Sequence, residues 1–244
     1  MKQGLFEIVE NKPLTDCVYK MVLRGDVSAI TAPGQFVNMK LEGLYLRRPI
    51  SVCDVCEDTL TIIYKVVGKG TEQLSQMQNG TLDVLTGLGN GYDLSVSGDM
   101  PVLLGGGVGV PPMYMLAKQL IAQGKSVRVI LGFNTAAEVF YEDAFRSLGA
   151  DVTVTTVDGS YGDKGFVTDV LNTQTYTYFY TCGPEPMLKA VYKSSTTSGQ
   201  MSFEKRMGCG FGACMGCSCK TITGYKRICK EGPVMRKEEI LWED

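Results

Sequence analysis

The chain has 244 residues, a formal net charge of −2, nine cysteines and no histidine. Without an imidazole group it can form no Ser–His or Cys–His catalytic pair, no histidine-ligated haem, no Rieske centre and no Cys2His2 zinc site. The balance of 24 basic and 26 acidic residues creates no general basic field for nucleic acid or for an anionic membrane.

No segment has the pattern of a signal peptide or a membrane span. Residues 1–7 lack the apolar run of a secretory signal, and residues 100–117, the longest uncharged stretch, contain four Gly and three Pro. An odd number of cysteines without a secretion signal predicts a cytoplasmic protein, in which thiols serve a metal or redox chemistry.

The first 98 residues have the pattern of short strands separated by turns, several of them alternating between apolar and polar side chains. This pattern predicts an antiparallel β-barrel with one solvated face and a single inserted helix at residues 71–77. The expected strands cover residues 5–9, 17–23, 35–41, 50–53, 60–67 and 81–85.

From Pro101 onward, strands alternate with helices, which predicts a parallel sheet with helices on its faces. The expected strands are 102–104, 127–131, 152–155 and 178–181, and the expected helices are 113–123 and 142–148. The remaining residues are rich in Cys and Gly and show little periodicity. We therefore expect an α+β multidomain chain in three parts: a β-barrel at 1–98, an α/β domain at 99–200 and a cysteine-rich segment at 201–244.

Four cysteines of the last segment have the spacing C-x4-C-x2-C-x11-C, and they are Cys209, Cys214, Cys217 and Cys229. The first intervals are those of a plant-type 2Fe-2S loop, in which each iron needs two thiolates and the fourth ligand comes from a separate piece of chain. Glycines between the thiols leave room for backbone N–H groups to approach the sulfurs. The spacing therefore predicts a 2Fe-2S cluster.

Cys219 is a fifth thiol in this segment, and we expect it beside the cluster because the ligand pattern is complete without it. The alternative is a structural zinc site. Zinc sites usually use paired C-x2-C knuckles, and this segment offers one such pair. The spacing favours iron and sulfur over zinc.

A glycine loop lies between an expected strand and the helix that follows it. Backbone amides of such a loop and the helix N-terminus can hold a pyrophosphate, and proline suits the first helical turn. The pattern is not G-x-G-x-x-G, so a plain tight turn is the alternative. The candidate nucleotide-binding residues are Gly105, Gly106, Gly107, Gly109 and Pro111.

A second motif, Cys182-Gly183-Pro184 followed by Met187, also follows an apolar strand. A thiol at the carboxyl end of a strand lies where an open α/β sheet binds its ligands, although a buried structural cysteine has the same pattern. Residues 132–138, after the second strand, contain no Lys or Arg for a 2′-phosphate, which favours NAD over NADP.

The barrel part contains a candidate anion site. Arg48 and Ser51 open a strand with a guanidinium and a hydroxyl, and Gly70 and Thr71 begin the inserted helix, whose amides can bind phosphate. Each feature alone is typical of surface charge or of a turn. Their joint occurrence before a nucleotide domain favours a phosphate-bearing cofactor.

Together these motifs resemble the ferredoxin-reductase superfamily. Arg48-Pro49-Ile50-Ser51 is similar to its flavin motif, residues 105–112 to its nucleotide loop, and Cys182-Gly183-Pro184 with Met187 to its nicotinamide-side motif. The C-terminal position of the cysteine segment points to a smaller group within this superfamily. In this feature the chain resembles the electron-transfer subunits of dihydroorotate dehydrogenases of the B type. The resemblance spans essentially the whole chain.

The resemblance implies that the barrel binds FAD, the α/β domain binds NAD(H) and the last segment carries the cluster. Cys182 would lie beside the nicotinamide without acting as an acid or a base. A partner subunit with FMN would oxidise dihydroorotate, and the two kinds of subunit would form a heterotetramer of two plus two chains. No nucleic acid and no membrane are expected as partners. The residues that would contact FAD are Arg48, Pro49, Ile50, Ser51, Lys65, Val66, Val67, Gly70 and Thr71.

Two other functions fit parts of the sequence. The first is a flavin and iron–sulfur subunit of a ferredoxin:NAD(P) oxidoreductase, which differs in its partner and its pyridine nucleotide. The second is a zinc-stabilised interaction protein without catalysis. In the favoured reading, electrons pass singly from the partner through the cluster to FAD and leave as a hydride to NAD+.

Overall fold

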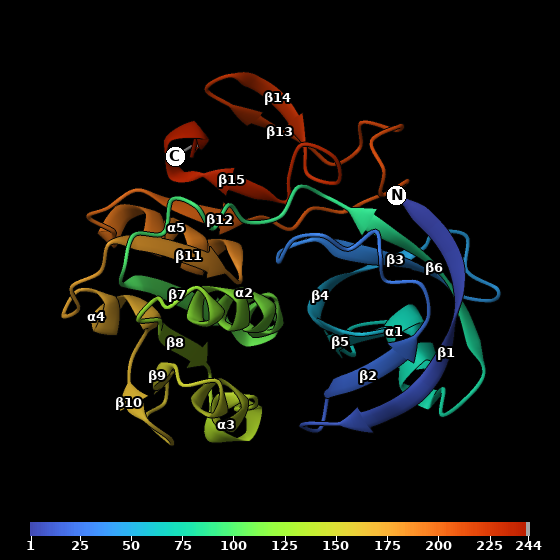
Figure 1. The fold of residues 1–244 in the computed structure, drawn as a ribbon, viewed down its shortest axis with the longest axis horizontal. Coiled ribbons are helices and arrows are strands. Elements are labelled where there is room, and N and C mark those ends of the chain that lie inside the picture. The colour runs from blue at the N-terminus through green and yellow to red at the C-terminus, as the bar shows by residue number, and fades with distance from the viewer. Residues whose placement is uncertain (243–244) are drawn as a thin grey trace.

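The computed structural model describes residues 1–242. Figure 1 shows a β-barrel beside an α/β domain, with the C-terminal segment lying across both. Among the described residues, no helix combines the length and the apolar character that a membrane crossing requires.

Six antiparallel strands form a closed barrel in the order β1-β2-β5-β4-β3-β6. Side chains that point inward, such as Met21, Val37 and Ile62, form its core. The expected barrel is confirmed. β1, β4 and β6 are longer than the sequence pattern indicates because polar residues continue the pairing beyond the apolar runs, whereas β3 and β5 are shorter than expected. The strands are β1 (Lys2–Pro13), β2 (Val18–Arg24), β3 (Phe36–Lys40), β4 (Arg48–Cys56), β5 (Thr59–Lys65) and β6 (Thr81–Leu88).

Helix α1 (Lys69–Gln76) is inserted between β5 and β6 and closes one end of the barrel with Leu74. The buried Asn11 side chain donates from Nδ2 to the carbonyls of Leu74 and Met77, both at 2.9 Å. The Tyr64 hydroxyl donates to Asn11 Oδ1 at 3.0 Å. A single side chain of β1 therefore holds the C-terminal end of the helix, where carbonyls lack intrahelical partners.

The second domain contains a seven-stranded sheet in the order β10-β9-β8-β7-β11-β12-β15. All neighbouring strands are parallel except β12 and β15. The expected parallel sheet is confirmed. The strands are β7 (Pro101–Gly106), β8 (Arg128–Phe133), β9 (Asp151–Thr156), β10 (Asp163–Lys164), β11 (Tyr178–Cys182), β12 (Gly199–Ser202) and β15 (Val234–Arg236).

Helices cover both faces of this sheet. α2 (Val110–Ala122) and α3 (Glu142–Ser147) pack on one face, in a core that also includes Cys53 and Ile63 of the barrel. α4 (Val167–Leu171) and α5 (Glu185–Ser194) pack on the other face. Because α2 lies against β4, its Lys118 reaches the Asp54 carboxylate at 2.9 Å and ties the two domains together.

The C-terminal segment is built onto both domains. Its strand β15 extends the parallel sheet, and β13 (Ser218–Thr221) forms a hairpin with β14 (Gly224–Arg227). The expected division between residues 200 and 201 falls inside β12. The last segment shares a sheet and a core with the second domain. The division into three parts therefore stays a proposal about which part of the chain holds which cofactor.

Three short 3-10 turns complete the elements of residues 1–242: η1 (Gly107–Gly109), η2 (Ala136–Glu138) and η3 (Lys237–Glu239). The sequence pattern did not indicate β10, α4, α5 or the strands after residue 198, because these elements are short or rich in polar residues. Two of them, β12 and α5, position residues of the site described next.

Candidate functional site

A cavity of about 670 Å³ opens at the carboxyl ends of the parallel strands, between the two domains. Strand β7 leads to α2 and then to β8 on one side, whereas β11 leads to α5 and then to β12 on the other. The crevice where the strand order reverses is the place where open α/β sheets bind ligands. Gly106 and Gly183 lie on its two sides and line the cavity.

The glycines of this cavity are required by close packing. A Cβ atom at Gly109 would lie 2.2 Å from the carbonyl oxygen of Cys182, and one at Gly106 would lie 2.4 Å from the Met187 sulfur. The two expected motifs therefore pack directly against each other. Gly106, Gly107, Gly109 and Gly183 line the cavity, and glycine loops that lead into helices let the backbone approach a pyrophosphate closely.

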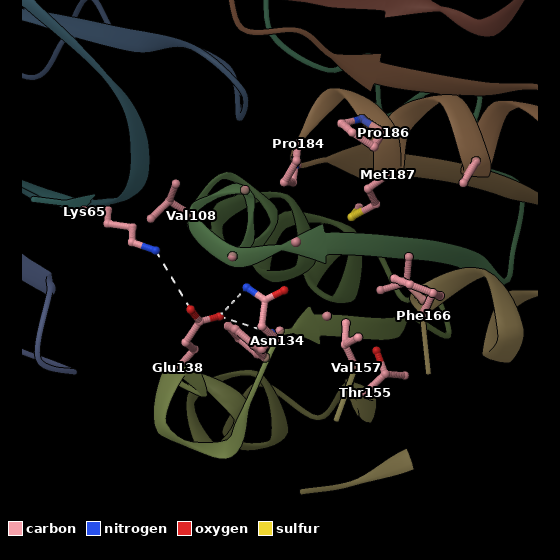
Figure 2. Close-up of a pocket in the computed structure, with 18 of the residues that line it drawn as sticks. Lys65, Val108, Asn134, Glu138, Thr155, Val157, Phe166, Pro184, Pro186 and Met187 are labelled. Carbon is pink, nitrogen blue, oxygen red and sulfur yellow. Dashed lines mark hydrogen bonds and ion pairs between the residues drawn. The ribbon is translucent and has the colours of Figure 1, made fainter. Parts of the chain in front are cut away.

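The opposite wall comes from the barrel and from the loop after β8. Figure 2 shows Lys65 of the barrel pointing at Glu138, with 4.0 Å between Nζ and Oε1. Glu138 Oε2 accepts hydrogen bonds from the backbone N–H and the side-chain amide of Asn134, at 3.1 and 2.9 Å. A fixed carboxylate thus stands at the carboxyl end of β8, where NAD-binding sheets recognise the ribose hydroxyls.

Cys182 is the last residue of β11, and only 2% of it is exposed. Burial, together with the nearby Glu204 carboxylate, raises the pKa of the Cys182 thiol to about 12 against a weaker opposing hydrogen bond with Ser202. The thiol therefore stays protonated near neutral pH. It does not itself line the cavity, whereas Gly183 and Pro184 do.

Glu204 follows β12 and lines the same cavity. Its side chain keeps contact with solvent, but the surrounding protein desolvates the carboxylate and raises the pKa of Glu204 above its usual value of 4.5. A carboxyl group whose pKa is raised toward the working pH is suited to give and take protons.

The structure brings two parts of the predicted anion site together, Arg48 and the N-terminus of α1. A Cβ atom at Gly70 would lie 2.1 Å from Arg48 Nε, so the guanidinium stem lies directly over the first helical turn. Thr71 Oγ1 accepts the backbone N–H of Val67 at 2.9 Å and fixes the loop that enters the helix. The neighbouring Arg47 is held by Asp83 at 2.9 Å and stabilises the barrel instead.

The four expected iron ligands lie in two pairs. Cys209 and Cys214 are within hydrogen-bonding contact of each other, and so are Cys217 and Cys229. Among the described residues, no three Cys, Asp or Glu side chains surround a single point closely enough for one metal ion. Two pairs are the arrangement that a 2Fe-2S cluster needs, because each of its irons takes two thiolates.

Backbone N–H groups point at these sulfurs. Cys209 Sγ accepts from Ala213 at 3.2 Å and from Cys214 at 3.4 Å, and Cys217 Sγ accepts from Cys229 at 3.4 Å. Partial burial acts to raise the Cys209 pKa, but backbone donors led by Phe211 outweigh it and lower the pKa to about 6. The loop therefore favours a thiolate, which is the form that binds iron.

Cys229 and Cys219 differ from Cys209. Burial and the adjacent Cys217 raise the pKa of the Cys229 thiol to about 12, so its ionisation depends on a bound metal. Burial also raises the pKa of Cys219, which lies on β13 and packs against the core cluster that contains Cys217 and Cys229. The residues present thus fit a four-cysteine cluster with Cys219 outside it.

Asn38 connects the thiol loop to the barrel. It is 1% exposed, and its Nδ2 donates to the carbonyl of Cys209 at 3.3 Å. Gly210 approaches so closely that a Cβ atom would lie 2.3 Å from Asn38 Nδ2. Asn38 pairs with Pro49 across β3 and β4, so a cluster ligand lies next to the strand that opens with Arg48.

The structure brings many predicted residues to the cavity and leaves others outside it. Gly105 and Pro111 are buried and do not line it, and of the barrel candidates only Lys65 lines it. Sequence reasoning missed Asn134, Glu138 and Glu204; a search for carboxylates after β8 would have found Glu138. Seven predicted residues line the cavity: Lys65, Gly106, Gly107, Gly109, Gly183, Pro184 and Met187.

Family profiles match two parts of the chain. Residues 204–241 match the iron–sulfur cluster binding domain of dihydroorotate dehydrogenase B, and residues 103–193 match the oxidoreductase NAD-binding domain. These ranges contain the paired thiols and the cleft glycines, respectively.

Similar proteins extend the match to the whole chain. The electron transfer subunit of dihydroorotate dehydrogenase B (NAD(+)) from Bacillus pumilus (strain SAFR-032) is 44% identical, with 98% of each chain covered. The subunit of the same name from Fusobacterium nucleatum subsp. nucleatum is also 44% identical, with 96% of each covered.

A solved structure of an NADH-dependent reduced ferredoxin-NADP oxidoreductase, described for flavin-based electron bifurcation, is 30% identical. It covers 98% of this chain and 90% of its own, with a TM-score of 0.89. A ferredoxin NADP+ reductase from Neisseria gonorrhoeae shares the fold, with a TM-score of 0.70 at 18% identity, covering 80% of this chain and 90% of its own. With its thiol pairs, its cleft and its near full-length relatives in agreement, the chain belongs to the family of electron transfer subunits of the NAD(+)-dependent dihydroorotate dehydrogenases B.

Proposed function

We propose that this chain carries electrons between a 2Fe-2S cluster held by Cys209, Cys214, Cys217 and Cys229 and an NAD(H) molecule in the cleft, with FAD on the barrel between them. The observation that carries the proposal is the contact of Asn38 with Cys209, because it brings a cluster ligand beside the Arg48–Ser51 strand. The proposed cluster, which transfers single electrons, and the proposed FAD site therefore both lie at the barrel.

The proposed electron donor is an FMN-containing catalytic subunit that oxidises dihydroorotate to orotate in pyrimidine biosynthesis. The names of the relatives as electron transfer subunits support a catalytic partner. A heterotetramer of two such chains and two catalytic subunits, working in the cytoplasm, is part of the same proposal.

FAD, when bound, supplies the exchange between one-electron and two-electron transfer. The protein's own part is to hold it: the Arg48 guanidinium and the N-terminal amides of α1 face its phosphates, and the strand containing Pro49 and Ser51 supports the rest. In this proposal Lys65, Val66 and Val67 reach the cofactor from the end of β5.

The cleft selects NAD over NADP through Glu138. Its carboxylate stands where the adenosine ribose would lie and can accept hydrogen bonds from the hydroxyls, whereas a 2′-phosphate would bring a second negative charge to the same place. Asn134 holds this carboxylate in position.

Glu204 supplies the proton that the electron balance requires. Two electrons that arrive singly and leave as one hydride consume one proton per turnover, and the chain has no histidine to deliver it. Glu204 lines the cleft beside Cys182 and has a raised pKa, so its carboxyl group can hold that proton. Cys182 remains a thiol that packs beside the nicotinamide position.

The test uses the purified chain with its cofactors. We expect NADH to reduce flavin and cluster, with visible and EPR signals of a 2Fe-2S centre, and we expect no oxidation of dihydroorotate until the catalytic subunit is added. A colourless preparation that contains zinc would overturn the proposal. Equal or better reduction by NADPH would favour a ferredoxin:NADP oxidoreductase subunit instead.

A further inference from the structure

One guanidinium group connects the separate pieces of chain that carry the cysteine pairs. Arg227 is the last residue of β14, where it pairs with Ser218, the residue after Cys217. Its Nη1 donates to the carbonyl of Gly212 at 2.6 Å, inside the loop between Cys209 and Cys214. One side chain therefore reaches from the strand beside the third cysteine to the loop of the first two.

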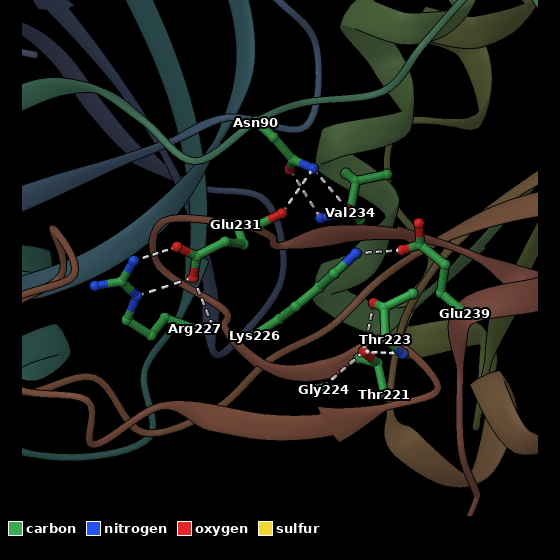
Figure 3. Close-up of polar contacts among 9 residues, drawn as sticks. All are labelled: Asn90, Thr221, Thr223, Gly224, Lys226, Arg227, Glu231, Val234 and Glu239. Carbon is green, nitrogen blue, oxygen red and sulfur yellow. Dashed lines mark hydrogen bonds and ion pairs between the residues drawn. The ribbon is translucent and has the colours of Figure 1, made fainter.

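The same residue organises the loop of the fourth cysteine. The Arg227 carbonyl accepts the N–H groups of Lys230, Glu231 and Gly232 at 3.0, 2.9 and 3.2 Å, which folds the chain tightly around Cys229. The Glu231 carboxylate accepts from the backbone N–H of Arg227 at 2.8 Å and from its Nε at 2.9 Å, and it also binds Nη2. Figure 3 shows this ion pair.

Asn90 attaches this loop to the segment that leaves the barrel. Its backbone N–H donates to Gly232 at 2.8 Å, and its Nδ2 donates to the carbonyls of Glu231 and Val234 at 3.1 and 2.7 Å. Its Oδ1 accepts the N–H of Val234 at 3.1 Å. Figure 3 shows Asn90 and Arg227 on either side of Glu231, so hydrogen bonds run from the barrel side to the loop of Cys209.

We propose that Arg227 is a positioning residue for the 2Fe-2S cluster, holding its four ligands together and supplying a positive charge that Glu231 partly offsets. The inference rests on the proposed function, since it requires the cluster. It deepens that function by assigning the control of the cluster's reduction potential to one ion pair.

The ion pair has an electrostatic signature that packing alone lacks. The reduced cluster carries one more negative charge than the oxidised cluster, so a nearby cation favours reduction and a nearby anion opposes it. Removing the charge of Arg227 should shift the midpoint potential to more negative values. Removing the charge of Glu231 should shift it to more positive values.

The experiment compares Arg227→Gln, Arg227→Lys and Glu231→Gln in the full chain with its cofactors. The midpoint potential is measured by EPR-monitored redox titration, and iron retention is followed by visible absorbance during incubation with a chelator. The matched control is Lys226→Gln, because Lys226 is the preceding residue and also pairs with a glutamate, Glu239, at 2.7 Å. Its change in net charge equals that of Arg227→Gln.

We expect opposite shifts in Arg227→Gln and Glu231→Gln, and neither shift in Lys226→Gln. Arg227→Lys should keep the potential near that of the unaltered protein but lose iron several-fold faster, because an ammonium group cannot bind Gly212 and Glu231 at once. Shifts of the same sign, or shifts equal to that of the control, would overturn the proposal. An unaltered chain without a 2Fe-2S signal would instead overturn the proposed function before any variant is compared.

Discussion

At the scale of single residues, the proposed function gives two carboxylates of the cleft tasks that in many enzymes fall to other groups. Glu204 would take the place of a histidine as the proton carrier, since the surrounding protein raises its pKa above the usual 4.5. Glu138 accepts hydrogen bonds from Asn134 and presents a fixed negative charge to the ribose position. Each can be tested by removing its charge while keeping its shape.

Replacing Glu204 with glutamine should lower the rate of NAD+ reduction about 100-fold, the low end of what a positioned acid contributes. The rate in the unaltered protein should fall as the pH rises through the raised Glu204 pKa, because only the protonated carboxyl can donate. The variant should lack this limb and lose its solvent isotope effect. Stopped-flow kinetics across pH would measure this, with Glu185→Gln as the control outside the cleft; an unchanged pH profile in Glu204→Gln would refute the assignment.

Replacing Glu138 with glutamine should raise kcat/KM for NADPH by about tenfold or more, because a like charge facing a phosphate costs several kcal/mol. The change also frees Lys65 from its carboxylate partner and allows it to face the 2′-phosphate. Steady-state kinetics with NADH and NADPH would check the ratio. Glu142→Gln, on α3 outside the cavity, should leave the ratio unaltered, and the same ratio in both variants would argue against Glu138.

The residues that the sequence indicated best are those whose chemistry depends on spacing. The plant-type intervals predicted Cys209, Cys214, Cys217 and Cys229 as one set of iron ligands; the structure places these thiols in two pairs, and their role as ligands stays a prediction. Glu204 escaped prediction since it follows β12, a strand of four residues that begins with Gly-Gln and has no periodic pattern. The packing of Asn38 on Cys209 joins residues 171 positions apart, which no local pattern reports.

At the scale of elements, the position of α1 depends on the barrel more than on its own sequence. An eight-residue helix is too short to be stable alone, so the hydrogen bonds of Asn11 to its C-terminal end decide where its N-terminus points. That N-terminus lies under Arg48, at the proposed phosphate site. An inserted helix was expected at residues 71–77, but its anchor on β1 was not.

Replacing Asn11 with alanine should lower the free energy of unfolding by about 2 kcal/mol or more, because it leaves the Met77 carbonyl and the Tyr64 hydroxyl without partners and removes one of the two hydrogen bonds to the Leu74 carbonyl. FAD affinity should fall with it, since the helix loses its orientation. Chemical denaturation and flavin fluorescence would measure both effects. Gln73→Ala removes an exposed contact of the same helix with Glu42 and should cost less than about 0.5 kcal/mol; equal losses in the two variants would contradict the anchor.

At the scale of the whole molecule, the C-terminal segment is both a carrier of thiols and a part of the second domain's core. Ile228, Met235 and Ile240 are buried in the same cluster as Phe179 and Met201 of the sheet. The three-part division read from the sequence followed composition, and composition does not show that a cysteine-rich segment also completes a sheet.

Loss of the cluster and loss of the segment should therefore differ. Cys229→Ser should abolish the 2Fe-2S signal while NADH still reduces bound flavin and the fold persists. A chain ending after residue 202 uncovers at least three large apolar side-chain contacts, each worth about 1.5–3 kcal/mol, out of a typical total stability of about 5–15 kcal/mol. Circular dichroism melting and gel filtration should show the truncated chain unfolded or aggregated, and a truncated chain as stable as Cys229→Ser would contradict the shared core.

The antiparallel pairing of β15 with β12 also bears on how the protein is made. During translation β12 is complete before the ribosome reaches residues 234–236, so the growing sheet keeps an open edge while the thiol loops are synthesised. The barrel, whose strands all precede residue 89, can close well before that point. Because Cys229 precedes β15, all four predicted iron ligands are synthesised before the strand that completes the described sheet, and the barrel proposed to hold the flavin is complete earlier still.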